Sequence, residues 1–307
     1  MVDNPKTAIA AAPEPVADGA GRVMAAIREQ QRLLAGAVVL PSAGVEDVHR
    51  GRVAARRLRS LLKTFRPLLE PRRARLYRMD LRSFAQALGG VREADVRREL
   101  LLAVAAKDES IPPGDRKRLE QLLDDACIAA RDALHRHQGE PGWAALRRAL
   151  ERLGAGEDLV VEREATLAQV LGLVARSWKR AVRLLEKEPE SAVELHELRL
   201  ALKHCRYALE PVADVVPKAS VRLIRRLRAA QDCIGEHRDT LLADHWLRSN
   251  ERMLGRTLAA RLAADLGRRE RALRKRAARR SRRVLVAWQD WRAATRRLRR
   301  ASNRGRA

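Results

Sequence analysis

The sequence predicts an all-α protein made of two pseudosymmetric antiparallel helical bundles that arose by tandem duplication. Composition gives the fold class: Leu, Ala, Arg and Glu dominate, aromatic residues make up 3% of the chain, and no run alternates apolar and polar residues as a half-buried strand would. An internal repeat gives the two bundles.

The repeat consists of a short motif at residues 49–59 and again at residues 196–206, which we call the first and second cassettes. Both read His-x-x-Arg-x-x-x-(Arg/Lys)-x-x-Arg, and their histidines lie 147 positions apart. Downstream, residues 88–93 (LGGVRE) are matched by residues 234–239 (IGEHRD), with the glycines 146 positions apart. Because two separate motifs keep nearly the same offset, the sequence indicates a duplication.

Glycine and proline divide the chain into helices. Residues 1–17 are rich in Ala and Pro without helical periodicity and are expected to be a disordered leader. Helix breaks are expected at residues 41–44, 67–71, 89–90, 111–114, 139–142, 154–156, 189, 211–217 and 235. The short connections between them favour antiparallel neighbours. The helical domain should span residues 18–295, with halves of about 18–155 and 156–295, before a basic disordered tail at 296–307.

The charge of the chain predicts an anionic partner. Lys and Arg number 64 against 39 Asp and Glu, a net charge of +25. Nucleic acid, an acidic membrane face and inorganic polyphosphate all satisfy such an excess. The preponderance of Arg favours phosphate, which a guanidinium binds through two parallel hydrogen bonds.

Cysteine use and hydropathy predict a protein of the reducing cytoplasm. Cys127, Cys205 and Cys233 are odd in number and widely spaced, so neither a disulfide framework nor a zinc ribbon is indicated. His135 and His137, two apart on a helix, point in different directions and make a poor metal pair. No secretory signal is seen, and no apolar run approaches the roughly 20 residues that span a bilayer.

Each cassette forms an amphipathic helix when its residues are placed at about 100° intervals. In the first cassette helix one stripe carries His49, Arg52, Arg56, Arg59 and Lys63. The opposite face is apolar: Ala54, Leu58, Leu61 and Phe65. The second cassette helix repeats the basic stripe with His196, Arg199, Lys203 and Arg206, and the apolar face with Ala201, Cys205, Ala208 and Val212.

Two interpretations of the basic stripes are open. A row of charges opposite an apolar face is often only a solvated surface, but such surfaces mix signs, whereas the stripe from His49 to Lys63 contains no carboxylate. We therefore expect the stripes to bind an anion. For the histidines the alternative is that each orients the neighbouring arginines through a hydrogen bond to another helix.

Further cations recur at the same offset. Arg82 matches Arg228, and Arg92 matches Arg238. The second pair follows the glycines, where the free N–H groups of a new helix would also favour an anion. The alternative interpretation is that the glycines are the C-caps of the preceding helices and that the acids which follow them cap the next helices.

At the cassettes and glycine turns the chain resembles the conserved histidine α-helical domain (CHAD) family, over residues 20 to about 295. The resemblance implies an all-helical, pseudosymmetric pair of bundles whose basic groove binds inorganic polyphosphate, and an association with polyphosphate granules. One departure is Glu93, where the family usually has Asp. The contacts that the resemblance implies are His49, Arg52, Arg56, Arg59, His196, Arg199, Lys203 and Arg206, followed by Arg82, Arg92, Arg228 and Arg238. The basic stripe adds Lys63 to the expected site.

The expected function is therefore binding without catalysis. Many relatives carry a triphosphate tunnel domain, but its strand-like Glu and Lys motifs do not occur in this chain. Neither a phosphate-binding glycine loop nor a nucleophile elbow is present, and no cofactor or metal is indicated. Granule components are possible partners. Nucleic acid is the alternative ligand or a nonspecific competitor, an enzyme acting on polyphosphate is a distant third, and the basic stretch 268–300 offers a second polyanion contact.

Overall fold

The computed structural model of the chain describes residues 19–38, 45–155, 159, 161–189 and 191–304. Within these ranges the chain forms helices and no β-strand, which confirms the all-α prediction. The predicted leader lies outside the described residues. The helices are α1 (Gly19–Val38), α2 (Val45–Thr64), η1 (Arg66–Leu68), α3 (Pro71–Ala87), α4 (Gly89–Ala105), α5 (Pro113–Gln138), α6 (Pro141–Gly154), α7 (Leu167–Ser177), α8 (Lys179–Glu186), α9 (Ala192–Leu209), η2 (Glu210–Val212), α10 (Pro217–Ser249), α11 (Glu251–Leu254) and α12 (Arg256–Arg304).

Local sequence explains where most of these helices begin. Helices α3, α5, α6 and α10 each have a proline in the first turn, where its fixed φ suits the helix and its missing N–H is not needed. Helices α7 and α9 start with capping boxes at Thr166 and Ser191, whose hydroxyls accept from the backbone N–H of Gln169 and Glu194. Sequence signals therefore place both the second cassette helix and its neighbour α7.

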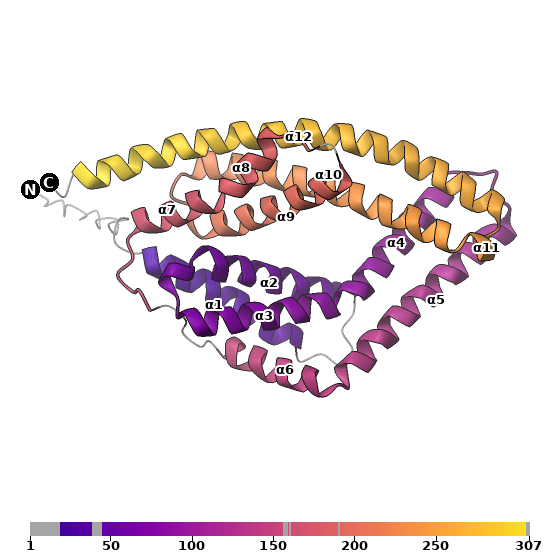
Figure 1. The fold of residues 1–307 in the computed structure, drawn as a ribbon, viewed down its shortest axis with the longest axis horizontal. Coiled ribbons are helices and arrows are strands. Elements are labelled where there is room, and N and C mark those ends of the chain that lie inside the picture. The colour runs from indigo at the N-terminus through magenta and orange to yellow at the C-terminus, as the bar shows by residue number, and fades with distance from the viewer. Residues whose placement is uncertain (1–18, 39–44, 156–158, 160, 190, 305–307) are drawn as a thin grey trace, which may run out of the picture.

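The helices form two groups that lie one above the other (Figure 1). Helices α1, α2, α3 and α6 make the lower group, and α7, α8 and α9 lie above them beneath the long helices α10 and α12. Helices α4, α5 and α11 form the far end of the molecule. The cassette helices α2 and α9 therefore belong to different groups and come into contact where the groups meet.

Two hydrophobic cores hold this arrangement. The main core is continuous across both groups and includes fully buried Phe65, Phe84, Trp178 and Trp291. A separate distal core joins α4 and α5 to α10, α11 and α12. Because α4 and α5 share a core with helices of the second half, the two halves depend on one another for burial of their apolar surface.

Helix α12 packs along α10 for most of its length. Trp291 donates from Nε1 to Ser220 Oγ at 3.1 Å, and His237 Nε2 lies 2.9 Å from Glu270 Oε1. On α12 the side chains of Leu273, Val284, Trp288 and Trp291 are buried, and Leu285 packs against the core.

Two sequence predictions are wrong. The expected break at Gly235 does not exist, because α10 runs unbroken from Pro217 to Ser249 and the glycine is buried within it. Residues 296–304 are not a disordered tail but the end of α12, continuing the helix past Thr295, which is still buried. Residues 305–307 lie outside the described part. In the first half the glycines do mark a boundary, since α4 begins at Gly89.

Candidate functional site: a basic pocket between the cassette helices

The apolar face of each cassette helix is buried, as predicted. On α2 the buried residues are Ala54, Leu58, Leu61 and Phe65, none more than 3% exposed. On α9 and η2 they are Ala201, Cys205, Ala208 and Val212. Burial of these faces turns each basic stripe away from its own bundle and toward the junction of the two groups.

Direct contacts join the two cassette helices. Arg57 Nε lies 3.4 Å from Glu210 Oε2, and Thr64 Oγ1 lies 3.5 Å from His204 Nε2. The guanidinium of Arg57 also lies over the ring of Tyr207, 5.6 Å from its centroid, on a ring that Arg206 approaches to 4.9 Å. These contacts fix the two basic stripes relative to each other.

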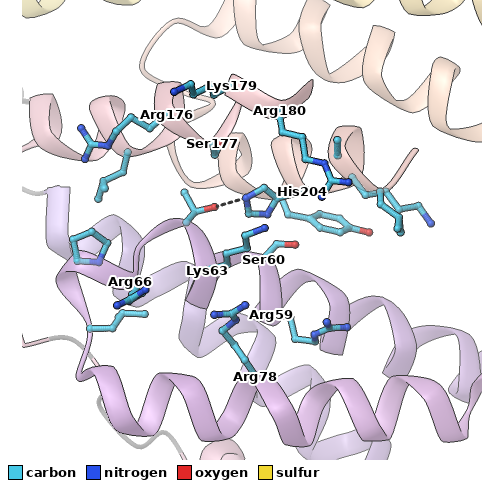
Figure 2. A pocket seen from close by; sticks show the side chains of 18 of the residues that line it. Arg59, Ser60, Lys63, Arg66, Arg78, Arg176, Ser177, Lys179, Arg180 and His204 are labelled. Carbon is cyan, nitrogen blue, oxygen red and sulfur yellow. Dashed lines mark hydrogen bonds between the residues drawn. The ribbon is translucent and has the colours of Figure 1, made fainter. Parts of the chain in front are cut away.

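A pocket of about 1350 Å³ opens between the groups. One wall comes from α2, η1 and α3, and the other from α7, α8 and α9 (Figure 2). Ten Lys and Arg residues line it: Arg56, Arg59, Lys63, Arg66, Arg78, Arg176, Lys179, Arg180, Arg183 and Lys203. His204 joins them, and the described residues of the lining include no Asp or Glu. The pocket is therefore a concavity of one charge sign, lined by both halves of the chain.

The cassettes supply only part of this lining. Arg56, Arg59, Lys63 and Lys203 are the predicted site residues that line the pocket. The sequence analysis missed the other basic residues that line it: Arg66, Arg78, Arg176, Lys179, Arg180, Arg183 and His204. A signal for one set existed, because residues 176, 179, 180 and 183 have the spacing of a single helical face.

Next to the pocket lies a cluster of cations that we call the inner cluster: Arg52, Arg56, Arg199, Lys203 and Arg206. Burial, followed by the charges of Arg56 and Arg199, lowers the pKa of Lys203 to about 6. The pKa of Arg52 falls to about 10, mainly through burial and then through Arg56. The cations of the two cassettes therefore destabilise one another's charged forms, as expected for like charges that are held close together.

Several nitrogens of the inner cluster are buried without a hydrogen-bond acceptor in the described structure. They are Arg52 Nη1, Arg56 Nε, Arg199 Nε and Arg206 Nε, the last of which lies 3.9 Å from Glu210 Oε1, too far for a hydrogen bond. A buried charged donor without an acceptor is costly, and an anionic oxygen is the acceptor that relieves the cost best. Chemically, the cluster is suited to holding an anion with many oxygen atoms.

Carboxylates lie at one edge of the inner cluster. Arg238 lies 3.6 Å from Glu93 and 3.7 Å from Asp239, so the residue that replaces the family's usual Asp pairs with a cation of the opposite half. Burial raises the pKa of Asp239 above its ordinary value. Arg238 is therefore held in place by acids of both halves. These contacts are those expected of acids that position an arginine.

The two cassette histidines are both partly buried. For His196, burial and then the charges of Arg238 and Arg199 lower the pKa below its ordinary value. His204 of α9 lies at the centre of the pocket beside Lys63 (Figure 2). Burial and Lys63 lower its pKa to about 4, so it is neutral at physiological pH.

A scan against protein-family models matches residues 24–248 to the CHAD domain. The chain belongs to the CHAD family. Solved structures agree with this assignment in fold. PptA from Streptomyces chartreusis is 21% identical with a TM-score of 0.69, over 89% of this chain and 99% of that one. The CHAD domain of the plant Ricinus communis is 22% identical with a TM-score of 0.64, over 92% and 97%. A search of curated proteins returned no match.

The glycines of the CHAD chain are explained by the cassette arginines. A Cβ on Gly89 would lie 3.3 Å from Arg52 Nη1, and one on Gly235 would lie 3.2 Å from Arg199 Nη2. In each half the glycine therefore lets the first cassette arginine lie against the helix backbone. This role replaces the predicted C-caps, and it also explains why Gly235 interrupts no helix.

The remaining predicted residues of the CHAD chain lie outside the pocket lining. Arg82 is exposed on α3, where its charge lowers the pKa of Arg59, and Arg92 is half-buried in the first turn of α4. Arg228 is exposed on α10, and no ion pair or hydrogen bond connects its side chain to the described residues of the site. Arg238 lies inside α10, so the predicted helix N-terminus beside it is wrong.

The described residues hold no group of three or more His, Cys, Asp and Glu placed to bind a metal ion. Cys127, Cys205 and Cys233 are buried free thiols. Among the described helices, none has both the length and the apolar character needed to cross a membrane.

Proposed function

We propose that this CHAD protein binds inorganic polyphosphate without catalysing its turnover. The observation that carries the proposal is the pocket, where ten Lys and Arg residues from both halves face one cavity whose described lining has no carboxylate. Polyphosphate is a thin, flexible chain with a negative charge on every unit. It fits a cleft lined from two sides better than a rigid duplex does.

The resemblance to the family extends the proposal to location. We expect the protein to reside in the cytoplasm on polyphosphate granules, with granule components as possible partners. A fluorescent fusion of the protein, imaged in cells that synthesise polyphosphate and in cells that do not, tests this expectation. Loss of foci when polyphosphate is absent is expected, and foci that persist unchanged would count against it.

Nucleic acid is the second candidate, since the same charge attracts any phosphate backbone. One observation disfavours it. Tyr207, the only aromatic residue in the described pocket lining, is 2% exposed and is held between Arg57 and Arg206. It cannot offer a face to a base, and base stacking supplies much of the affinity for single strands.

The test compares ligands and matched variants. Long-chain polyphosphate, single-stranded RNA and duplex DNA are titrated at about 150 mM salt, where weak nonspecific attraction is screened. The pocket variant replaces four exposed lining cations that form no ion pair with the described residues: Lys63→Gln, Arg66→Gln, Arg176→Gln and Lys179→Gln. The surface control removes four exposed cations elsewhere: Lys107→Gln, Lys117→Gln, Arg136→Gln and Arg148→Gln.

Polyphosphate should bind most tightly to the wild type and to the surface control. The slope of log K against log salt is negative, and in the pocket variant its magnitude should be smaller by about 3, because each of the four lost phosphate contacts removes roughly 0.7. Equal losses in the pocket variant and the surface control would refute the proposed site. Tighter binding of RNA or DNA than of polyphosphate would favour the second candidate.

The noncatalytic part of the proposal has its own measurement. Polyphosphate incubated with the protein, with and without Mg²⁺, should keep its chain length and release no orthophosphate. Time-dependent shortening that the pocket variant abolishes would make the protein an enzyme.

Binding should also depend on pH through the cassette histidines. A bound polyanion favours the protonated form, and His196 has a lowered pKa, so its contribution to affinity should grow as pH falls below about 6.5. The double variant His49→Gln, His196→Gln should lose this part of the pH dependence. A wild-type pH profile in that variant would contradict the role.

A further inference from the structure

The outward side of α12 carries a dense row of cations that the pocket does not use. Residues 271–289 contain eight Lys and Arg and no Asp or Glu. Three of these cations have partners that lie inward or beside the helix: Arg274 with Glu270, Arg280 with the Ala229 carbonyl, and Arg282 with Glu188.

The other five define what we call the α12 basic face: Arg271, Lys275, Arg276, Arg279 and Arg283. All five are exposed and form no ion pair within the described part of the chain. At about 100° per residue they fall within an arc of roughly 140°, opposite the buried row of Leu273, Ala277 and Val284. They extend over about 18 Å of helix.

Helix α8 connects the pocket to the helix that carries this face. Lys179, Arg180 and Arg183 of α8 line the pocket. Trp178, which precedes α8, stacks on Trp288 of α12 with ring centroids 4.1 Å apart. The two basic surfaces are therefore linked through α8 but separated by α8 and by the width of α12 itself, about two helix diameters or roughly 20–24 Å.

We propose that the α12 basic face is a second polyphosphate-binding surface, occupied by the part of a long chain that extends out of the pocket. The inference rests on the proposed function and adds a dependence on chain length. Its support is the row of cations without carboxylates and the proximity of α8 to both surfaces. Because Trp288 and Trp291 are buried, the face offers no ring to stack on a base or to enter a membrane interface.

Chain length decides whether the second surface contributes. The ten Lys and Arg side chains of the pocket, of which Lys203 is largely neutral in the folded chain at pH 7, match a chain of at most about ten phosphate units, and such a chain has no charge left for α12. A chain roughly ten times longer reaches both surfaces at once, so the second contact forms at a high effective concentration. Neutralising the α12 basic face should therefore lower the affinity for long chains and leave the affinity for short chains unchanged.

The experiment uses the full chain and polyphosphate of these two lengths at about 150 mM salt. The α12 variant carries four substitutions to glutamine, which has a similar helix propensity. They are Arg271→Gln, Lys275→Gln, Arg279→Gln and Arg283→Gln. The surface control defined above removes the same number of charges elsewhere, and the pocket variant completes the set. Circular dichroism confirms equal helix content.

The expected result is at least a tenfold loss of affinity for the long chain in the α12 variant, with short-chain affinity equal to that of the surface control. If the α12 variant binds both lengths as the surface control does, the second surface is refuted while the pocket proposal stands. If the pocket variant also has no effect on the short chain, the proposed function fails as well. If the α12 variant loses affinity for duplex DNA or for anionic phosphatidylserine vesicles but binds long polyphosphate as the wild type does, the α12 basic face is assigned to that partner instead.

Discussion

Replacing Lys203 with methionine should make the protein more stable while weakening its binding. Lys203 is partly buried among Arg56 and Arg199, and its pKa falls from 10.5 to about 6 in the folded chain. A shift of one unit corresponds to about 1.4 kcal/mol. At pH 7 the folded state must therefore deprotonate this lysine at a cost of up to about 5 kcal/mol, the upper value being reached if the neighbouring arginines do not turn away.

The pH dependence has a definite sign. The unfolded chain holds the Lys203 proton up to about pH 10.5 and the folded chain only up to about pH 6, so the unfolded state binds more protons between these values. Stability consequently rises with pH through this window. Between pH 6.5 and 8 the free energy of unfolding of the wild type should increase by about 2 kcal/mol from this residue.

Urea denaturation followed by circular dichroism at pH 6.5, 7 and 8 measures both effects. Lys203→Met should unfold at higher urea than the wild type at pH 7 and should lack the increase toward pH 8. Lys203→Arg, which stays charged throughout, should also lack the increase but remain less stable than Lys203→Met. If Lys203→Met is less stable than the wild type, or keeps its pH slope, the crowding of cations inferred for the inner cluster is wrong.

Two further predictions concern the support of the site. Gly89→Ala should lower polyphosphate affinity severalfold without lowering the melting temperature, because its Cβ would lie 3.3 Å from Arg52 Nη1 while alanine favours the helix. Gly90→Ala, whose Cβ meets nothing within 4 Å, is the matched control, and equal binding by the two variants would contradict the role of the glycine. Trp178→Ala should cost about 3–5 kcal/mol in urea unfolding, because this ring is fully buried and stacks on Trp288. A loss below about 1 kcal/mol would mean that the α8 and α12 contact is not a stabilising one.

Local patterns in the sequence were sufficient for much of the fold. Helical periodicity identified the buried faces of both cassette helices, because burial selects apolar residues at 3.6-residue intervals whatever the neighbour is. Proline marked the starts of α3, α5, α6 and α10 for the reason that it suits only the first turn. Gly235 was misjudged because the same residue type ends a helix or allows close packing within one, and the sequence does not distinguish the two.

The sequence by itself determined the class of the fold, its family, the excess of positive charge and the cassette cations Arg56, Arg59, Lys63 and Lys203. Only the tertiary structure decided which other cations join them. Arg66 and Arg78 come from one side of the pocket, and Arg176, Lys179, Arg180 and Arg183 come from helices about a hundred residues later in the chain. The physical reason is that charge interacts through space: a stripe on a single helix shows which side chains are aligned, but the packing of α2 against α9 sets which of them face the same cavity and how strongly burial perturbs them.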